Sequence, residues 1–276
     1  MSKIASQVPK RNPSGFTPDA PFMCFADCGA GNPFSYQVDA DDFNSFATGA
    51  WTATENNAGT IALTAGGGGL LLFTTGTTAT NYAFIQRPAA NVSLPQGSTA
   101  GKKLFFGARL QLASLNSGFI AGLINATTTP FSAIADGIWF SKAAGAIGSN
   151  ALQLNVSVGS TNLATALSFT PVAATEFDVA FYIDQYGNLQ YSIGSQLFGW
   201  IPQSGTGAST STPEDYSSLP ILCPTGKLYS GNQATYTATS GYALTTANLS
   251  LTAGVVTSAA AAQTMTLNFL GALRER

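Results

Sequence analysis

The stretch EFDVAFYIDQYGNLQYSIG, from Glu176 to Gly194, decides the fold. Its first half alternates large apolar side chains with polar or small ones. Successive side chains of a β-strand point to opposite faces of the sheet, so such alternation predicts a strand with one buried face. The residues on that buried face are Phe177, Val179, Phe181 and Ile183.

A tight turn is expected to fold the second half back onto the first. A three-residue loop of residues 185–187 places Gly187 in the left-handed conformation that closes a type I turn with a bulge, between Asp184 and Asn188. Apolar residues then face apolar residues across the hairpin, and a one-residue slip would break every pair. The predicted pairs are Val179–Ile193, Phe181–Tyr191 and Ile183–Leu189.

The remaining pattern predicts an all-β protein, an antiparallel β-sandwich of the jelly-roll, concanavalin-like type. Short apolar runs recur roughly every ten residues and are separated by Gly, Asn, Asp or Ser, which is typical of sandwiches. We expect one sandwich domain over residues 36–276, with long loops around residues 199–260 that are rich in Ser, Thr, Pro and Gly.

Residues 1–35 contain five prolines and no sustained period, which predicts an extended arm without regular hydrogen-bonded ladders. The arm also carries large apolar groups, so we expect it to lie on its own domain or on a neighbour. The candidate contact residues are Lys10, Arg11, Phe16, Phe22 and Phe25.

Composition restricts the function. Charged residues make up 9% of the 276 residues, against about 25% in an ordinary soluble domain, which favours a surface covered by neighbours. The net charge of −2 and the sparse basic residues predict no nucleic-acid partner. No apolar run is long enough to span a bilayer and the N-terminus lacks a secretory signal, so we expect a soluble protein made in a cytoplasm.

The acids Glu176 and Asp178 raise the question of catalysis. Sandwich-fold retaining glycosidases carry Glu-x-Asp followed closely by a second Glu, because two carboxyl groups must flank the scissile bond. Here Ala180 and Phe181 occupy the positions of the second Glu. The chain also has no histidine, which excludes Ser-His and Cys-His catalysis. The sequence therefore predicts that the protein is not an enzyme.

No cofactor or metal site is predicted. The run from Gly97 to Lys103 has the wrong spacing for a phosphate-binding loop. The three cysteines, Cys24, Cys28 and Cys223, lack the partners of a zinc site and are expected to be reduced thiols. The acids Asp39, Asp41 and Asp42 lack the calcium-loop spacing and are interpreted as an exposed acidic turn, with cation binding as the less favoured alternative.

Several aromatic residues allow two interpretations. Rings of this kind stack on sugars at some surfaces, but more often they fill cores and interfaces, which we favour here. The residues concerned are Trp51, Trp139, Trp200, Tyr182 and Tyr186.

Four stretches in this order resemble tailed-bacteriophage virion structural proteins with a concanavalin- or laminin-G-like jelly-roll core. They are LFFGARLQL (104–112), FIAGLIN (119–125), DGIWFSKA (136–143) and FDVAFYIDQYGNLQYSIG (177–194). The resemblance covers residues 104 to about 200 and its motifs are structural, whereas the arm and the last seventy or so residues match nothing we can name.

The resemblance implies a capsid decoration (cement) protein on the virion exterior, assembled in the host cytoplasm. Its partner would be the major capsid protein, and it would clamp neighbouring capsid subunits as a homo-oligomer, with a trimer favoured. The alternative is a tail-fibre or receptor-binding, lectin-like protein that recognises host glycans.

Overall fold

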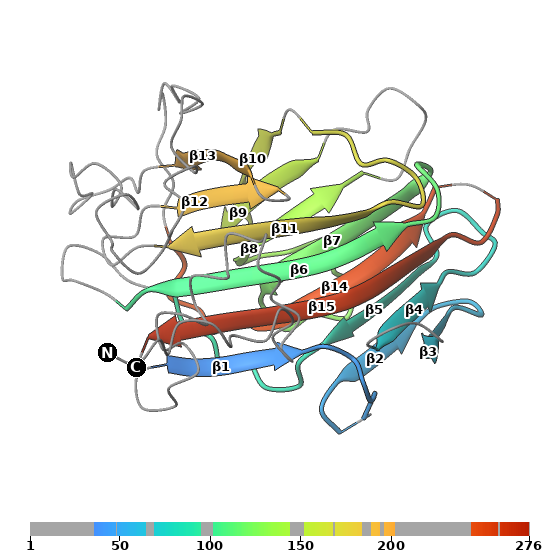
Figure 1. The fold of residues 1–276 in the computed structure, drawn as a ribbon, viewed down its shortest axis with the longest axis horizontal. Helices are drawn as coiled ribbons and strands as arrows, with labels where there is room; N and C mark the ends of the chain where they lie inside the picture. Colours follow the sequence, from blue (N-terminus) through green and yellow to red (C-terminus); the bar gives the residue numbers. More distant parts are fainter. Residues whose placement is uncertain are drawn as a thin grey trace, which may run out of the picture.

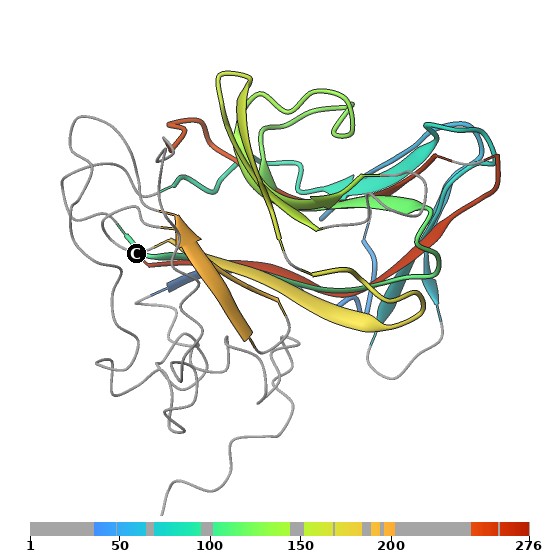
Figure 2. The same ribbon diagram turned by 90° about the horizontal axis from the view of Figure 1, so that it is seen from above.

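The computed structural model describes residues 36–47, 49–64, 69–94, 102–143, 152–167, 169–183, 189–193, 196–201, 244–258 and 260–275. Within these ranges every regular element is a β-strand, and the strands form two antiparallel sheets packed face to face (Figures 1 and 2). This arrangement confirms the predicted all-β antiparallel sandwich. The arm of residues 1–35, with its candidate contact residues, lies outside the described ranges.

The first layer, called sheet A, is drawn in front in Figure 1 and has the order β13-β12-β11-β6-β15-β4-β3. β1 and β4 lie end to end along one side of the long last strand, since β1 pairs with its second half and β4 with its first. The strands are β1 (Tyr36–Asp41), β3 (Thr60–Thr64), β4 (Leu70–Thr74), β6 (Leu104–Leu112), β11 (Glu176–Ile183), β12 (Leu189–Ile193), β13 (Gln196–Ile201) and β15 (Thr264–Glu275).

The second layer, called sheet B, has the order β10-β9-β8-β7-β14-β5-β2. Its strands are β2 (Thr52–Glu55), β5 (Tyr82–Gln86), β7 (Ser117–Ile124), β8 (Gly137–Lys142), β9 (Gln153–Val158), β10 (Thr161–Ala166) and β14 (Ser250–Thr257).

The prediction of long loops around residues 199–260 is wrong at its end, because β14 lies there and occupies the place between β7 and β5 in sheet B. All but one of the β14 residues are buried, so the strand lacks the polar face that reveals a strand in a sequence. Its small residues serve close packing. A side-chain carbon on Gly254 would come within 2.3 Å of the Phe84 Cβ.

The core lies between the sheets, where the opening hairpin supplies one wall. β11 pairs with β12 as Val179↔Ile193, Phe181↔Tyr191 and Ile183↔Leu189, which are the pairs expected from the sequence. These side chains are buried, and Phe181 stacks on Phe106 with ring centroids 4.8 Å apart. Phe177 meets Phe119 of sheet B edge-on. The turn residues Asp184, Gly187 and Asn188 lie outside the described ranges.

Candidate functional site

The outer face of sheet B carries the side chains that gather into a site. On β9, Leu154 and Val156 belong to the core, so Gln153 and Asn155 point to the opposite face. On β8, Phe140 belongs to the core and Trp139 and Ser141 point outward. The strand register therefore aligns polar and aromatic residues of neighbouring strands on the same outer face. Trp139 faces Asn155 on one side and Gly122 on the other.

Three polar side chains form a hydrogen-bonded row across β10, β9 and β8, which we call the polar ladder. The Asn162 side-chain amide donates to Asn155 Oδ1 at 3.2 Å, and the Asn155 amide donates to Ser141 Oγ at 2.8 Å. Asn155 is buried and both of its amide atoms are engaged. The ladder therefore keeps the Asn162 carbonyl oxygen and the Ser141 hydroxyl proton for a further partner.

The β9–β10 hairpin, which carries Asn155 and Asn162 of the ladder, closes with a tight two-residue turn. Gly159 and Ser160 join β9 to β10 with φ values of 56° and 68°. Positive φ at both central residues is the type I′ turn, which matches the twist of the flanking strands. The Ser160 backbone N–H also donates to the Ala135 carbonyl oxygen at 2.8 Å.

The segment between β7 and β8, residues 125–136, folds back over the same face, and we call it the strap (Figure 2). At its start, Gln86 Nε2 donates to the Asn125 carbonyl oxygen at 3.3 Å and Gln86 Oε1 accepts from the Thr127 N–H at 3.1 Å. At its end, Ser157 Oγ lies 3.1 Å from the Ile134 carbonyl oxygen. Hydrogen bonds at both ends therefore hold the strap in place.

Aromatic side chains line the strap's underside. Phe131 on the strap lies 5.8 Å, centroid to centroid, from Tyr82 on β5, and both rings are half-buried. The Tyr82 hydroxyl donates to the Thr128 carbonyl oxygen at 3.2 Å. Trp139 packs in a small apolar cluster with Ile120, Ile124 and the strap. Tyr82 and Phe131 thus present ring surface on the same face of sheet B as the polar ladder, and β7 and β14 lie between β5 and the ladder strands.

The strap and the sheet enclose a groove of about 870 Å³, called the sheet-B groove. No aspartate or glutamate occurs among the described residues that line it. The cation among them is Lys142, whose side chain is buried and donates to the carbonyl oxygens of Leu115 and Ser117. Burial lowers the pKa of this ammonium group. The groove therefore offers hydroxyls, amides and aromatic rings.

One residue at the groove rim has an unusual backbone conformation. Thr80 has a φ of 71°, which is rare for a β-branched residue because its side chain crowds the backbone. Its N–H donates to the Thr257 carbonyl oxygen at 2.8 Å, which fixes the rim to the end of β14. Both residues line the groove.

The acids of the opening hairpin lie on the other side of the molecule, on the outer face of sheet A. Arg109 of β6 binds Asp178 through two hydrogen bonds of 2.6 and 2.9 Å. The hydrogen bond to Asp178 raises the pKa of Arg109, with burial opposing it. Glu176 Oε1 accepts from the Asn268 amide at 3.1 Å. The two acids thus link β11 to β6 and, beyond it, to β15, while Ala180 and Tyr182 further along this face are buried.

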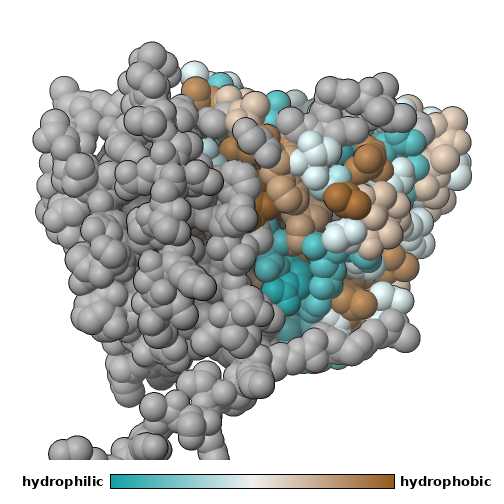
Figure 3. Space-filling model, turned by 45° about the horizontal axis from the view of Figure 1, so that its top comes forward, coloured by the Kyte–Doolittle hydropathy of each residue, from teal (hydrophilic) through white to brown (hydrophobic). Residues whose placement is uncertain are grey.

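The surface seen in Figure 3 mixes hydrophilic and hydrophobic residues in its described part. Isolated apolar groups are ordinary on a folded surface. The large apolar residues that are exposed among the described ones are Val38, Leu63 and Val172.

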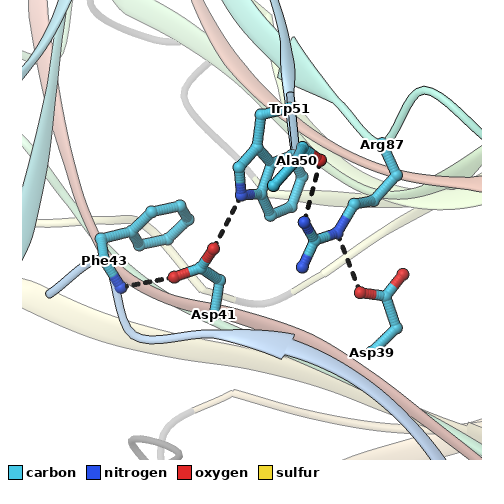
Figure 4. A network of polar contacts seen from close by, with 6 residues as sticks. All are labelled: Asp39, Asp41, Phe43, Ala50, Trp51 and Arg87. Carbon is cyan, nitrogen blue, oxygen red and sulfur yellow. Dashed lines mark hydrogen bonds and ion pairs between the residues drawn. The ribbon is translucent and has the colours of Figure 1, made fainter. Parts of the chain in front are cut away.

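The prediction that Asp39, Asp41 and Asp42 form an exposed acidic turn is wrong, because all three are partly buried. Asp39 and Asp41 are also bound to other side chains (Figure 4). Asp39 pairs with Arg87 at 2.8 Å, and Asp41 accepts hydrogen bonds of 2.8 Å from the Trp51 indole and from the Phe43 N–H. Burial raises the pKa of Asp39, and the charge of Arg87 opposes that shift. The network joins β1 of sheet A to the end of β5 in sheet B.

Arg87 completes this network on the side of sheet B. Its guanidinium carbon lies 3.9 Å from the centre of the Trp51 ring, and Nη1 donates to the Ala50 carbonyl oxygen at 2.9 Å. No group of three or more metal-ligating side chains occurs among the described residues. The acids therefore act as structural partners for Arg87 and Trp51.

The aromatic residues that the sequence offered for stacking on sugars differ in where the structure places them. Trp51 is 1% exposed and Tyr182 stacks on Phe105 with centroids 4.1 Å apart, so both pack as the favoured interpretation expects. Trp139 is 7% exposed and lines the sheet-B groove. Tyr186 lies outside the described residues, and the side chain of Trp200 is likewise not described.

No family model matches the sequence, and no curated protein matches it. Solved structures match its fold. An endo-1,3-β-glucanase from Streptomyces sioyaensis is 13% identical with a TM-score of 0.54, covering 88% of this chain and 97% of its own. Peanut lectin is 9% identical with a TM-score of 0.49, covering 87% and 97%. A glucuronan lyase from Trichoderma reesei is 11% identical with a TM-score of 0.46, covering 86% and 94%.

The two antiparallel sheets and the match to the endo-1,3-β-glucanase establish a concanavalin-like jelly-roll sandwich, and that match overturns one prediction. The prediction that the chain is not an enzyme, drawn from the missing second Glu and the absent histidines, is wrong, because the endo-1,3-β-glucanase has the same fold. One scaffold carries both binding and catalytic sites, so a broken motif on sheet A does not decide what the molecule does. The described part of the chain contains no helix of the length and hydrophobicity needed to cross a membrane.

Sequence reasoning missed the sheet-B groove, although its polar face is visible in the sequence. Gln153, Asn155 and Ser157 alternate with the apolar residues that identified the strand. The contribution of Tyr82 and Phe131 was not visible, because they lie 49 positions apart and meet only through the strap.

Proposed function

We propose that the protein binds an oligosaccharide in the sheet-B groove. The observation that carries the proposal is that the polar ladder of Asn162, Asn155 and Ser141 lines the same groove as the half-buried rings of Tyr82 and Phe131. Amide and hydroxyl groups donate and accept hydrogen bonds, as sugar hydroxyls do. Aromatic rings cover the apolar face of a sugar ring.

The dimensions of the groove support an oligosaccharide ligand. Its volume of about 870 Å³ lies within the roughly 300–1,000 Å³ typical of ligand pockets. The ladder crosses three neighbouring strands, and strands lie about 4.8 Å apart, so it extends over about 10 Å. A ligand that contacts the whole ladder is longer than one sugar ring.

The sequence resemblance to phage virion proteins supports one setting for this binding. There the protein would be a receptor-binding, lectin-like component that attaches the particle to glycans of the host surface. Such a protein works at many copies per particle, and weak single-site binding becomes strong attachment through multivalency.

The test is a glycan array followed by calorimetric titration of the strongest oligosaccharide. Replacing the exposed Asn162 with alanine should weaken binding at least tenfold, because the ladder loses its outer member. The matched control is Asn268→Ala, which removes a similarly bonded amide from the outer face of sheet A. Equal affinity of the Asn162→Ala variant and the wild type would reject the groove as the binding site.

The second candidate function is capsid decoration. Two observations favour it: the charged fraction of 9%, and the exposure of Val38 and Leu63 on the edge strands β1 and β3. As a decoration protein the chain would bind the major capsid protein on the shell exterior as a homo-oligomer, with a trimer favoured. Co-sedimentation of the protein with empty shells tests this function. A protein that is present in isolated tails and does not bind shells would reject capsid decoration.

A further inference from the structure

The charge of the sheet-B groove selects its ligand, and this inference rests on the glycan-binding function proposed above. The described side chains lining the groove supply hydroxyls, amides and rings, with no carboxylate. We infer that the ligand is an uncharged oligosaccharide, and that glycans bearing uronate, sulfate or sialate groups are discriminated against.

The argument begins with the nearest cation. Lys142 shares its face of β8 with the core residue Phe140, so its ammonium group lies on the inner side of sheet B. There it donates to the carbonyl oxygens of Leu115 and Ser117. A carboxylate bound in the groove would therefore compete with these two carbonyl oxygens for the ammonium group.

The acid of the strap, Asp136, also has its hydrogen-bond partners outside the groove lining. Asp136 Oδ1 accepts hydrogen bonds from the Thr245 hydroxyl at 2.6 Å and from the Gly159 N–H at 3.1 Å. Asp136 does not line the groove. It therefore fixes the strap to the β9–β10 hairpin and to the chain before β14. Among the described residues that line the groove, Lys142 is then the charged one, and its ammonium group is bonded to two backbone oxygens.

Desolvation decides the selectivity. Moving an ionised group from water into a site without a paired counter-charge costs far more than moving a hydroxyl that finds a hydrogen-bond partner. The ladder supplies such partners for hydroxyls through Asn162 and Ser141. A neutral glycan therefore replaces its lost water contacts, whereas an acidic one loses hydration that the groove does not restore.

The experiment is an array that carries neutral oligosaccharides next to uronate, sulfated and sialylated oligosaccharides of equal length. A matched pair is cellohexaose and the β-1,4-linked glucuronic acid hexamer, which differ at carbon 6 of each ring. We expect signals from neutral members at least tenfold above those from acidic members, and affinities that change little with salt. Acidic members that bind as well as their neutral counterparts would overturn this inference and leave glycan binding intact.

A charge-adding variant tests whether the discrimination against acidic glycans comes from their charge or from their shape. Ala133→Lys puts a cation on the strap at the groove without removing a ladder member, and we expect it to raise the signal of acidic members severalfold at low salt. The control is Asn268→Lys on the outer face of sheet A, which should not change that signal. If Ala133→Lys gains no acidic signal, charge is not the basis of selection. Absence of signal from every glycan would reject both this inference and the proposed function.

Discussion

The side-chain amide of Asn162 donates to Asn155 Oδ1 at 3.2 Å, across the tight turn that joins β10 to β9. Asn155 passes the contact on to Ser141 of β8 at 2.8 Å. Three neighbouring strands thus share one row of polar atoms on the outer face of sheet B. This row distinguishes the face from an ordinary solvated sheet surface, since its middle member is buried.

Gly122 is expected to be essential for the floor of the groove. A Cβ at this position would lie 2.4 Å from both the Ile138 carbonyl oxygen and the Trp139 Cβ, so the two strands would have to separate. We predict that Gly122→Ala lowers the free energy of unfolding by about 1–3 kcal/mol. Gly49→Ala is the control, because no atom lies within 4 Å of its added carbon. Equal denaturation midpoints for both variants would contradict the packing.

Gln86 is predicted to control the order of the strap. Its amide bonds Thr252 Oγ1 at 2.7 Å and also holds the strap at Asn125 and Thr127. Gln86→Leu should speed amide hydrogen exchange in residues 125–131 and weaken glycan binding. Tyr82→Phe, which removes one exposed hydrogen bond to the strap, should have the smaller effect on exchange. Unchanged exchange in the Gln86→Leu protein would show that the strap is held by other contacts.

The acids of β11 are predicted to differ in their effect on stability. Asp178→Asn breaks the two-pronged contact with Arg109 and should cost about 1–3 kcal/mol in the free energy of unfolding. Glu176→Gln should cost less than about 0.5 kcal/mol, because its contact with Asn268 is exposed. Chemical denaturation measures both values. A larger loss for Glu176→Gln would reverse the structural roles assigned here.

Lys142 predicts a dependence of stability on alkaline pH. Burial lowers its pKa below the ordinary value of 10.5, so between the two values the unfolded chain binds more protons than the folded one. The free energy of unfolding should therefore gain from this group as the pH rises through that window. Lys142→Met should remove this gain. Urea denaturation across the range measures it, and parallel curves for the two proteins would refute it.

The sequence was sufficient for the elements whose two faces differ. Phe177, Val179 and Phe181 alternate with polar or small neighbours, and the alternation together with the expected three-residue turn predicts the register of β11 against β12. β14 was missed because Ala253 and Val255 on one face and Thr252 and Gly254 on the other are all buried. A strand buried on both faces has no period to detect.

The site depends on contacts that no local pattern contains. Asn155 and Asn162 are close in the sequence, and their hairpin was within reach of prediction. The strap was not, because its attachment joins Gln86 to Thr127 and Ser157 to Ile134 over long separations. Likewise, Asp39 and Asp41 resembled an exposed turn, since their partners Arg87 and Trp51 approach only when the two sheets are assembled.

The most direct test fills the groove and leaves the rest of the molecule unchanged. Ser141→Trp introduces a large ring at the inner end of the ladder, and Thr266→Trp introduces the same ring on the outer face of sheet A, where Thr266 contacts Gln111. Titration with the strongest array oligosaccharide should show no binding to Ser141→Trp and wild-type affinity for Thr266→Trp, with both variants folded by circular dichroism. Undiminished binding to the Ser141→Trp protein would contradict the assignment of the sheet-B groove as the glycan site.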